Sequence, residues 1–164
     1  MYIARHMEKQ ILSATENFPV LLVTGERQVG KSTVLQHLAG AGREYVTLDD
    51  PLERQLAREQ PQRFLQLHRA PVLIDEIQYA PELFPYIKME VDRRQEDGLY
   101  WLTGSQVFAL MKNVQESLAG RVMVVRLQGI SQSEEIGIRH KPFPSQLEDM
   151  LDLSKNPAVQ SLFS

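Results

Sequence analysis

One stretch near the amino terminus constrains the fold more than any other part of the chain. Residues 20–24 are apolar or β-branched, which predicts a buried strand, and the pattern Gly-x-x-x-x-Gly-Lys-Ser follows at once. Only glycine lets a loop turn tightly enough for several backbone N–H groups to converge on one anion. The stretch therefore predicts a loop for the phosphates of a nucleoside triphosphate, and the alternative is an ordinary glycine turn with an exposed lysine. The expected contacts are Gly25, Glu26, Arg27, Gln28, Val29, Gly30, Lys31, Ser32 and Thr33.

The polar positions of this loop have separate expected tasks. Lys31 brings a point charge to the β- and γ-phosphates, and Ser32 offers a hydroxyl oxygen to Mg²⁺. The helix that follows presents the positive end of its dipole to the same anion. ATP and Mg²⁺ are therefore the expected ligands. ATP is favoured over GTP because the sequence has no Asn-Lys-x-Asp motif that would recognise guanine.

A second chemical motif follows further along the chain. Four apolar residues, 71–74, form an expected buried strand that leads into Asp75 and Glu76. Asp75 lies 44 positions after Lys31 (75 minus 31). We expect Asp75 to hold Mg²⁺, directly or through water. Glu76 should project to the other face of the pleat and orient or deprotonate an attacking water. The alternative for Asp75 is a helix cap.

Four more residues are candidates for the same site, each with a plainer alternative. Thr103 and Ser105 end the expected strand 99–105, where hydroxyls can contact the γ-phosphate or the water, although turns also favour such residues. Arg121 precedes the strand 122–127, where it can reach the phosphate of a neighbouring subunit or remain an ordinary surface arginine. Arg5 lies in the leading helix and either contacts the nucleotide or only packs.

Composition excludes several other classes of protein. The 164-residue chain is 43% hydrophobic, which suits one domain with one sizeable core. It has no cysteine, so disulfides and thiolate chemistry are excluded, and its four histidines lack metal-ligand spacing. The net charge of −3 indicates no dedicated nucleic-acid surface. The pair Arg93-Arg94 most simply belongs to a solvated helix face, and a basic partner site is the alternative. Apolar runs are too short to span a bilayer and no secretory signal is evident, so we expect a cytoplasmic protein without a membrane partner.

Short apolar runs alternate with amphipathic stretches, which is typical of a parallel sheet covered by helices. The expected strands are 20–24, 45–48, 71–76, 99–105 and 122–127. The first expected helices are 2–15, the segment from the phosphate loop to Gly40, and two segments that follow a cap at Asp50 and are divided at Gln60-Pro61. The later expected helices are 80–97, 106–112, 131–138 and a last one near 147–151. We therefore predict an α/β, three-layer P-loop NTPase fold with a mostly parallel sheet of about five strands.

Five sequence blocks resemble the bacterial and archaeal AAA-type ATPase family that usually carries a carboxy-terminal domain of unknown function. The blocks are GERQVGKST (25–33), YVTLDDP (45–51), VLIDEIQYAPELFPY (72–86), LTGSQ (102–106) and ESLAGRV (116–122). The resemblance implies an ATPase core over residues 1–136, a water-activating glutamate at Glu76 and a polar sensor at Thr103 or Ser105. It also implies that 137–164 are a short helical or linker extension beginning a second, often nuclease-like domain. We therefore expect this chain to represent the ATPase part alone, without a helical lid or a second sensor arginine. Its hydrolysis is then expected to be slow or absent.

The expected function is Mg²⁺-dependent ATP binding and hydrolysis by an AAA-type domain. One alternative is an ATP-binding switch module without turnover, and another is a P-loop kinase for a small molecule. Glu76 directly after Asp75 speaks against a kinase, which must avoid activating water. The expected partners are ATP and a second copy of the chain, with Arg121 acting across the interface. The protein or nucleic acid to which turnover is coupled is left open.

Overall fold

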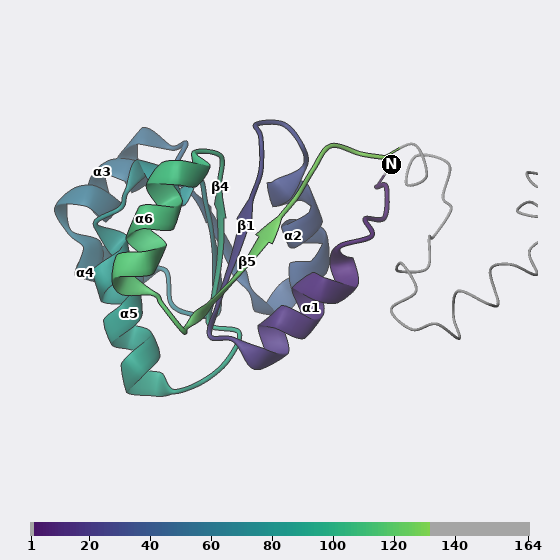
Figure 1. Ribbon diagram of the computed structural model, residues 1–164. Helices are drawn as coiled ribbons and strands as arrows, with labels where there is room; N and C mark the ends of the chain where they lie inside the picture. Colours follow the sequence, from purple (N-terminus) through teal and green to yellow (C-terminus); the bar gives the residue numbers. More distant parts are fainter. Residues whose placement is uncertain (1, 132–164) are drawn as a thin grey trace, which may run out of the picture.

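The protein, seen in a computed structural model that describes residues 2–131, is built on a five-stranded parallel sheet (Figure 1). The strands are β1 (Val20–Thr24), β2 (Glu44–Thr47), β3 (Val72–Asp75), β4 (Tyr100–Gly104) and β5 (Val122–Arg126), in the spatial order β2-β3-β4-β1-β5. The helices are α1 (Glu8–Asn17), α2 (Lys31–Ala39), α3 (Pro51–Glu59), α4 (Pro61–Leu67), α5 (Leu83–Arg94) and α6 (Val107–Ser117), with the 3₁₀ turns η1 (Gly40–Gly42) and η2 (Ile77–Tyr79). The predicted three-layer α/β fold is confirmed.

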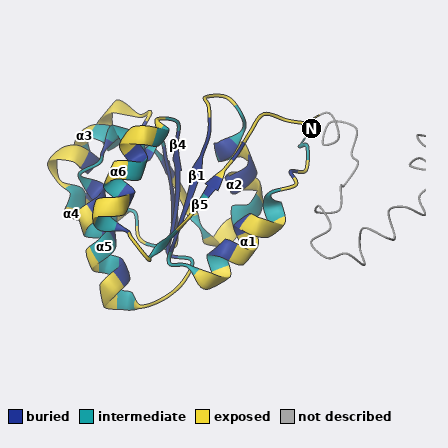
Figure 2. Ribbon diagram, viewed as in Figure 1, coloured by how far each residue is buried: buried dark blue, intermediate teal, exposed yellow. Residues whose placement is uncertain are grey.

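The sheet buries both of its faces, and this explains its nearly continuous apolar strands. Leu21 and Val23 pack with α1 and α2, whereas Val20 and Leu22 pack on the other face with α3 to α6. Figure 1 shows these two helical layers on either side of the sheet, and Figure 2 shows the central strands buried between them. A parallel sheet covered on both faces needs apolar residues at successive positions, as in β1.

The register brings the carboxyl ends of the strands to one edge. Thr24 of β1 lies beside Gly104 of β4, and Thr47 of β2 lies beside Asp75 of β3. In open parallel sheets this edge is where ligands bind, because the polar loops that follow the strands converge there. Residues separated by tens of positions in the sequence therefore meet at one place.

The first helix begins later than predicted. The expected helix over residues 2–15 is observed as α1, which starts only at Glu8 and ends at Asn17. The cause is local: the Glu8 carboxylate accepts hydrogen bonds from the Arg5 backbone N–H and the Tyr2 hydroxyl, both at 2.7 Å. These bonds hold the preceding residues in a separate segment that runs towards the phosphate loop.

The sixth helix is longer than predicted, and α5 (Leu83–Arg94) is shorter at both ends than the predicted 80–97, whereas α2, α3 and α4 lie where they were predicted. The expected helix 106–112 extends to Ser117 because Leu110, Val114 and Leu118 continue one buried stripe at four-residue spacing. The Asp50 carboxylate caps α3 by accepting from the Leu52 N–H at 2.8 Å, as expected.

The predicted helices over 131–138 and near 147–151, and the predicted 137–164 extension, fall outside the described residues from position 132 onward. Within residues 2–131, no helix combines the length and the apolar character needed to cross a bilayer.

Candidate nucleotide site

The loop between β1 and α2 adopts a conformation that depends on its glycines. A Cβ atom at Gly25 would lie 2.3 Å from the carbonyl oxygen of Leu127, so no larger residue fits there. Gly30 has a φ of +89° and forms the N-cap of α2. The backbone N–H groups of the first turn of α2 therefore open toward the loop, as a phosphate site requires.

Lys31 is held inside this loop. Its side chain is 4% exposed, and Nζ donates to the carbonyl oxygens of Gly25 at 3.2 Å and Glu26 at 2.8 Å. Within residues 2–131 no carboxylate pairs with it. A buried ammonium surrounded only by neutral carbonyls is a costly arrangement that an anionic ligand would relieve.

Asp75 lies at the centre of a ring of hydroxyl groups. Its Oδ1 accepts from Ser32 and Thr103, each at 2.5 Å, and its Oδ2 accepts from Tyr45 at 3.1 Å and Thr47 at 3.4 Å. These donors come from α2, β4 and β2, so the carboxylate joins three elements at the edge of the sheet. The helix-cap alternative does not apply, because no bond from Asp75 to a helix N–H occurs in the described part of the chain.

The direction of the Ser32 bond matters for metal binding. The hydroxyl proton of Ser32 points at Asp75, so the lone pairs of its oxygen remain available to a cation. Residues 2–131 contain no cluster of three or more His, Cys, Asp or Glu side chains that could hold a metal alone. A cation here would therefore depend on Ser32, Asp75, water and phosphate oxygens, which is the donor set that Mg²⁺ prefers.

Thr103 lies deeper in the site than a phosphate contact requires. It is fully buried, and its hydroxyl donates to Asp75 while accepting from the Glu76 N–H at 2.9 Å. The single hydroxyl proton is used on Asp75, so Thr103 cannot also donate to a phosphate in this arrangement. Ser105, which is half-buried, is the better placed of the two for a ligand contact.

Glu76 is oriented by a turn and not by the pleat. Strand β3 ends at Asp75, and Glu76 adopts left-handed angles of φ 59° and ψ 48°. We expected the alternation of the pleat to direct Glu76 to the other face from Asp75. Instead, the left-handed turn at Glu76 sets the direction of its side chain. Left-handed geometry is uncommon for a side chain such as glutamate and costs of order 1 kcal/mol, so neighbouring contacts must hold it.

Gln78 supplies such a contact. Its Nε2 donates to Oε2 of Glu76 and, at 3.2 Å, to the Ser105 hydroxyl, which in turn donates to the same Glu76 oxygen at 3.3 Å. Three side chains thus form a closed hydrogen-bonded triangle beside Asp75.

Arg121 lies at the opposite edge of the sheet. It immediately precedes β5, and its carbonyl oxygen accepts from the N–H of Val20 at the start of β1. The length of β1, roughly 16 Å, separates it from the phosphate loop of its own chain. Its guanidinium holds Asp92 with two bonds, Nε at 2.6 Å and Nη2 at 3.2 Å. Arg121 therefore cannot take part in the site of its own subunit.

Arg5 ties the amino-terminal segment to the loop. Its guanidinium donates to the carbonyl oxygens of Val29 at 2.9 Å and Gln128 at 2.5 Å. Beside it lies a cavity of about 350 Å³ whose lining includes Tyr2, Ile3 and Ile130 together with phosphate-loop residues. The packing alternative for Arg5 is thus seen directly, and a nucleotide contact stays a prediction.

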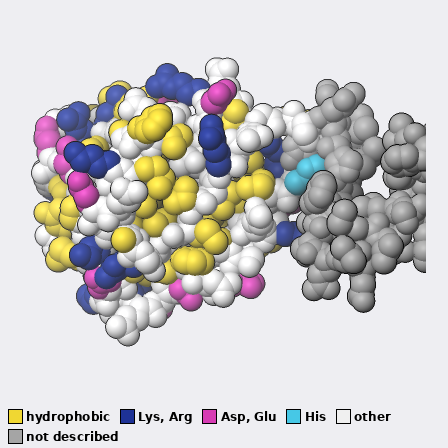
Figure 3. Space-filling view, in the orientation of Figure 1, with side chains coloured by type: hydrophobic (Ala, Val, Ile, Leu, Met, Phe, Trp, Pro, Cys, Tyr) yellow, Lys and Arg dark blue, Asp and Glu magenta, His cyan; other side chains and the backbone are white. Residues whose placement is uncertain are grey.

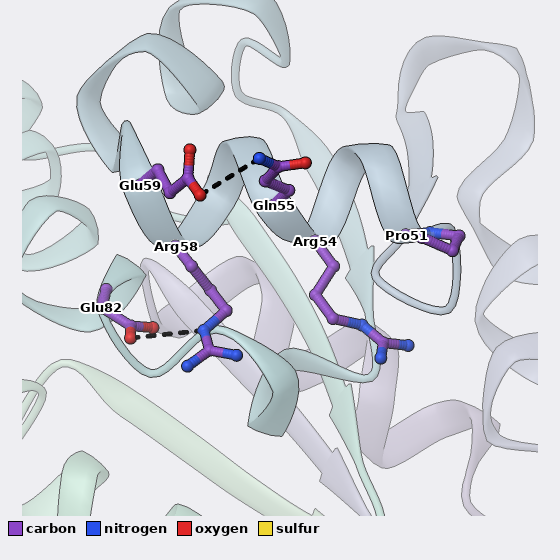
Figure 4. Close-up of a pocket in the computed structure, with 6 residues that line it drawn as sticks. All are labelled: Pro51, Arg54, Gln55, Arg58, Glu59 and Glu82. Carbon is purple, nitrogen blue, oxygen red and sulfur yellow. Dashed lines mark hydrogen bonds and ion pairs between the residues drawn. The ribbon is translucent and has the colours of Figure 1, made fainter.

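A second pocket, of about 410 Å³, lies beside α3 (Figure 4). Figure 4 shows Arg58 directed at Glu82, with 3.6 Å between Nε and Oε1. Arg54 lies over the ring of Tyr79 at 4.0 Å, and the Tyr79 hydroxyl accepts from Arg27 of the phosphate loop at 3.0 Å. None of the predicted site residues lines this pocket, so it neighbours the site and does not form it.

Sequence analysis missed Tyr45, Thr47 and Gln78. Tyr45 and Thr47 face the same side of β2, and only the pairing of β2 with β3 brings them to Asp75. Burial, followed by the charge of Asp75, raises the pKa of Tyr45 above its ordinary value. Gln78 carried a weak signal, because it is a polar residue two positions after a predicted catalytic glutamate.

Comparison with known protein families agrees with this geometry. Residues 17–136 match a family described as an AAA domain, which is well over half of the chain. This chain belongs to the AAA domain family. Membership of this family supports nucleotide binding and hydrolysis at a general level.

Individual relatives give less detail. Uncharacterised proteins of Mycobacterium bovis and Mycobacterium tuberculosis are each 34% identical over 129 residues, covering 77% of this chain and 29% of their own length. The chain thus spans under a third of the length of these two curated relatives. Among solved structures, the Walker-type ATPase PABY2304 of Pyrococcus abyssi has a TM-score of 0.58 at 20% identity, with 93% of this chain and 63% of that one covered. A structure titled as a DNA replication initiation factor has a TM-score of 0.50 at 12% identity, covering 95% and 61%. These two similarities support the fold.

Proposed function

We propose that this AAA domain binds ATP together with Mg²⁺ and hydrolyses it. The observation that carries the proposal is the 2.5 Å hydrogen bond from Ser32 to Asp75. It joins the phosphate loop to the strand-end carboxylate across 43 sequence positions, as a shared metal and phosphate site requires. The buried Lys31 beside it adds the positive charge that a polyphosphate needs.

Each residue has a stated task in the proposed reaction. Lys31 and the N–H groups at the start of α2 neutralise phosphate charge, which matters most as charge shifts in the transition state. Glu76 accepts a hydrogen bond from the attacking water and fixes its direction. Thr103 holds both carboxylates in place through its bonds to Asp75 and the Glu76 N–H.

The residues present fit a magnesium ion. Ser32 and Asp75 would hold it, Ser32 through its free lone pairs and Asp75 directly or through water. When bound, Mg²⁺ supplies Lewis-acid stabilisation of phosphate charge.

The cavity beside Arg5 is the proposed binding site of the adenine base. It adjoins Gly30 and Thr33 on the phosphate side, and apolar surface from Ile3 and Ile130 faces it. An adenine in this cavity would contact apolar side chains while its phosphates lie near the loop.

The decisive test compares Glu76→Gln with the unchanged protein. The variant should bind a fluorescent ATP analogue with the same affinity, because its amide has the size of the carboxylate. Phosphate release should fall by roughly 10²-fold or more, because the amide cannot accept a proton from water. Both are measured on the full 164-residue chain with Mg²⁺ present.

Three outcomes would change or replace this proposal. Equal phosphate release from both proteins would mean that Glu76 is not the catalytic base. No release from either protein while ATP binds would leave a nucleotide-binding switch without turnover. ATP that stays intact alone but is consumed when a small-molecule acceptor is added would indicate a kinase.

A further inference from the structure

The contacts of Gln78 set it apart from the other polar side chains near the phosphate loop. Its amide nitrogen donates to Glu76 and to Ser105, and both acceptors belong to the candidate site. Glu76 and Gln78 flank Ile77, which is fully buried and anchors η2 against the core. The short turn therefore delivers the amide to the carboxylate with little freedom.

The other end of the Gln78 amide has an unusual environment. Its Oε1 is buried and accepts no hydrogen bond from the described residues. A buried carbonyl without a donor costs about 1–3 kcal/mol, so the arrangement persists only if the nitrogen side is well bonded. The space for this oxygen exists because residue 104 is glycine: a Cβ there would lie 2.9 Å from it.

The carboxylate of Glu76 is held on one side only. Gln78 and Ser105 both donate to Oε2, and within residues 2–131 no donor reaches Oε1. One oxygen is thus fixed while the other stays available to a water molecule. Two donors on one oxygen also define the plane of the carboxylate, which a single bond would leave free to rotate.

We propose that Gln78 is a positioning residue for the hydrolytic reaction, acting with Ser105 to hold Glu76 so that Oε1 faces the attacking water. The inference rests on the proposed ATPase function and adds to it a residue that orients the base. A base misplaced by a fraction of an ångström loses much of its effect, so the triangle should control the rate of the chemical step.

The test is Gln78→Met, which keeps the length of the side chain and removes the amide. We expect kcat for phosphate release to fall about tenfold or more while KM for ATP and the melting temperature stay close to those of the unchanged protein. Gln55→Met is the matched control, because Gln55 is an exposed amide on α3 that bonds only Glu59 among the described residues. The same change there should leave kcat as it was.

A double variant separates positioning from general damage. In the Glu76→Gln background the base is already removed, so adding Gln78→Met should lower kcat no further. An additional loss in that background, or an unchanged or raised kcat in the single variant, overturns the proposal while leaving the ATPase function intact.

A second measurement does not depend on turnover. In ¹⁵N-labelled protein the side-chain NH₂ signals of Gln78, identified by their loss in Gln78→Met, should be shifted downfield by the carboxylate and return to ordinary values in Glu76→Ala. Signals at ordinary values in the unchanged protein would overturn the proposal by showing that the contact is absent. If the contact is seen but the unchanged protein releases no phosphate, the ATPase function fails, and the positioning role fails with it.

Discussion

Asp75 gathers hydroxyl groups from four residues, Ser32, Tyr45, Thr47 and Thr103. These donors use both oxygens of the carboxylate and fix its orientation. The carboxylate is also immobile, because its two oxygens are tied to α2, β2 and β4 at once. The site is therefore preformed around its acid before any ligand arrives.

Thr103→Val tests this view at the level of one hydroxyl. The change keeps the shape of the side chain but removes the donor to Asp75 and the acceptor for the Glu76 N–H. We expect the free energy of unfolding, measured with urea, to fall by about 1–3 kcal/mol, because a buried N–H loses its partner. Phosphate release should fall as well, because both carboxylates lose a restraint.

Thr47→Val is the comparison for that experiment. Its hydroxyl donates to the same carboxylate, but over 3.4 Å and from a half-buried position. A smaller loss of stability is expected there. Equal losses in the two variants would contradict a special role for Thr103.

For single residues, the sequence predicts those contacts of the candidate site that depend on local spacing, and it does not predict those that depend on the tertiary fold. Lys31 and Ser32 follow from spacing alone, since a loop of fixed length brings them to one anion. The contact of Tyr45 depends on the pairing of β2 with β3, and the contact of Gln78 depends on the left-handed turn at Glu76. Neither feature can be predicted from the spacing of residues in the sequence. The site could therefore be predicted as a set of motifs but not as a hydrogen-bonded network.

Strand β4 contacts both helical layers and the candidate site. Its Leu102 packs towards α3–α6, Trp101 packs towards α1 and α2, and Thr103 enters the site. Tyr100 is 1% exposed at the start of the strand, and burial, with a smaller contribution from Glu90, raises its pKa from 10.0 to about 12. The strand thus carries an ionisable group that the fold keeps neutral.

This predicts a specific loss of stability in alkali. The unfolded chain releases the Tyr100 proton near pH 10, whereas the folded chain retains it to about pH 12. Stability is therefore complete below pH 10 and declines as the pH rises through this window, by roughly 2–3 kcal/mol for this group. Urea unfolding from pH 9 to pH 12 should show a flatter decline for Tyr100→Phe than for the unchanged protein. Parallel curves would contradict the prediction.

The boundaries of elements were predicted less well than their existence. Strand positions followed from apolar runs, and the proline and carboxylate signals before α3 marked its start within one residue. Helix α1 was misjudged because Glu8 bonds backward to Arg5 and Tyr2, which removes the first turns that periodicity alone suggested. Tertiary contacts decide such ends, and periodicity does not contain them.

At the scale of the whole molecule, the outer strand β5 lies in surroundings different from those of the candidate site. Strand β5 is an outer strand of the sheet, and Figure 3 shows hydrophobic side chains gathered over α6 and β5 on the visible face. The large exposed ones on these two elements are Phe108, at 96%, and Met123, at 38%. Arg121 lies at the start of this strand, far from the nucleotide edge of its own sheet.

Arg121 offers a test of assembly. Its bond to Asp92 raises the pKa of Arg121 and lowers that of Asp92, so both are charged at neutral pH and the pair must open before Arg121 reaches another subunit. If Arg121 serves a neighbour's phosphate, Lys31→Ala and Arg121→Ala proteins should each be inactive alone. Mixed in equal amounts they should regain about a quarter of the activity, because random pairing joins the two intact residues at one interface in four.

Arg93→Ala is the control for the Arg121 variant, because Arg93 is a surface arginine that pairs with Glu90 on its own helix. It should remain fully active alone. Two inactive proteins that show no recovery at any mixing ratio would rule out action across an interface.

The side chain of Arg5 links two segments that are far apart in the sequence. One end of its guanidinium is bonded to Val29 in the phosphate loop and the other to Gln128, two residues beyond β5. A loop that shifts to receive a phosphate must therefore carry the exit of the sheet with it or break one of these bonds. A ligand that moved the loop would in this way also act on the point where the chain leaves its last strand.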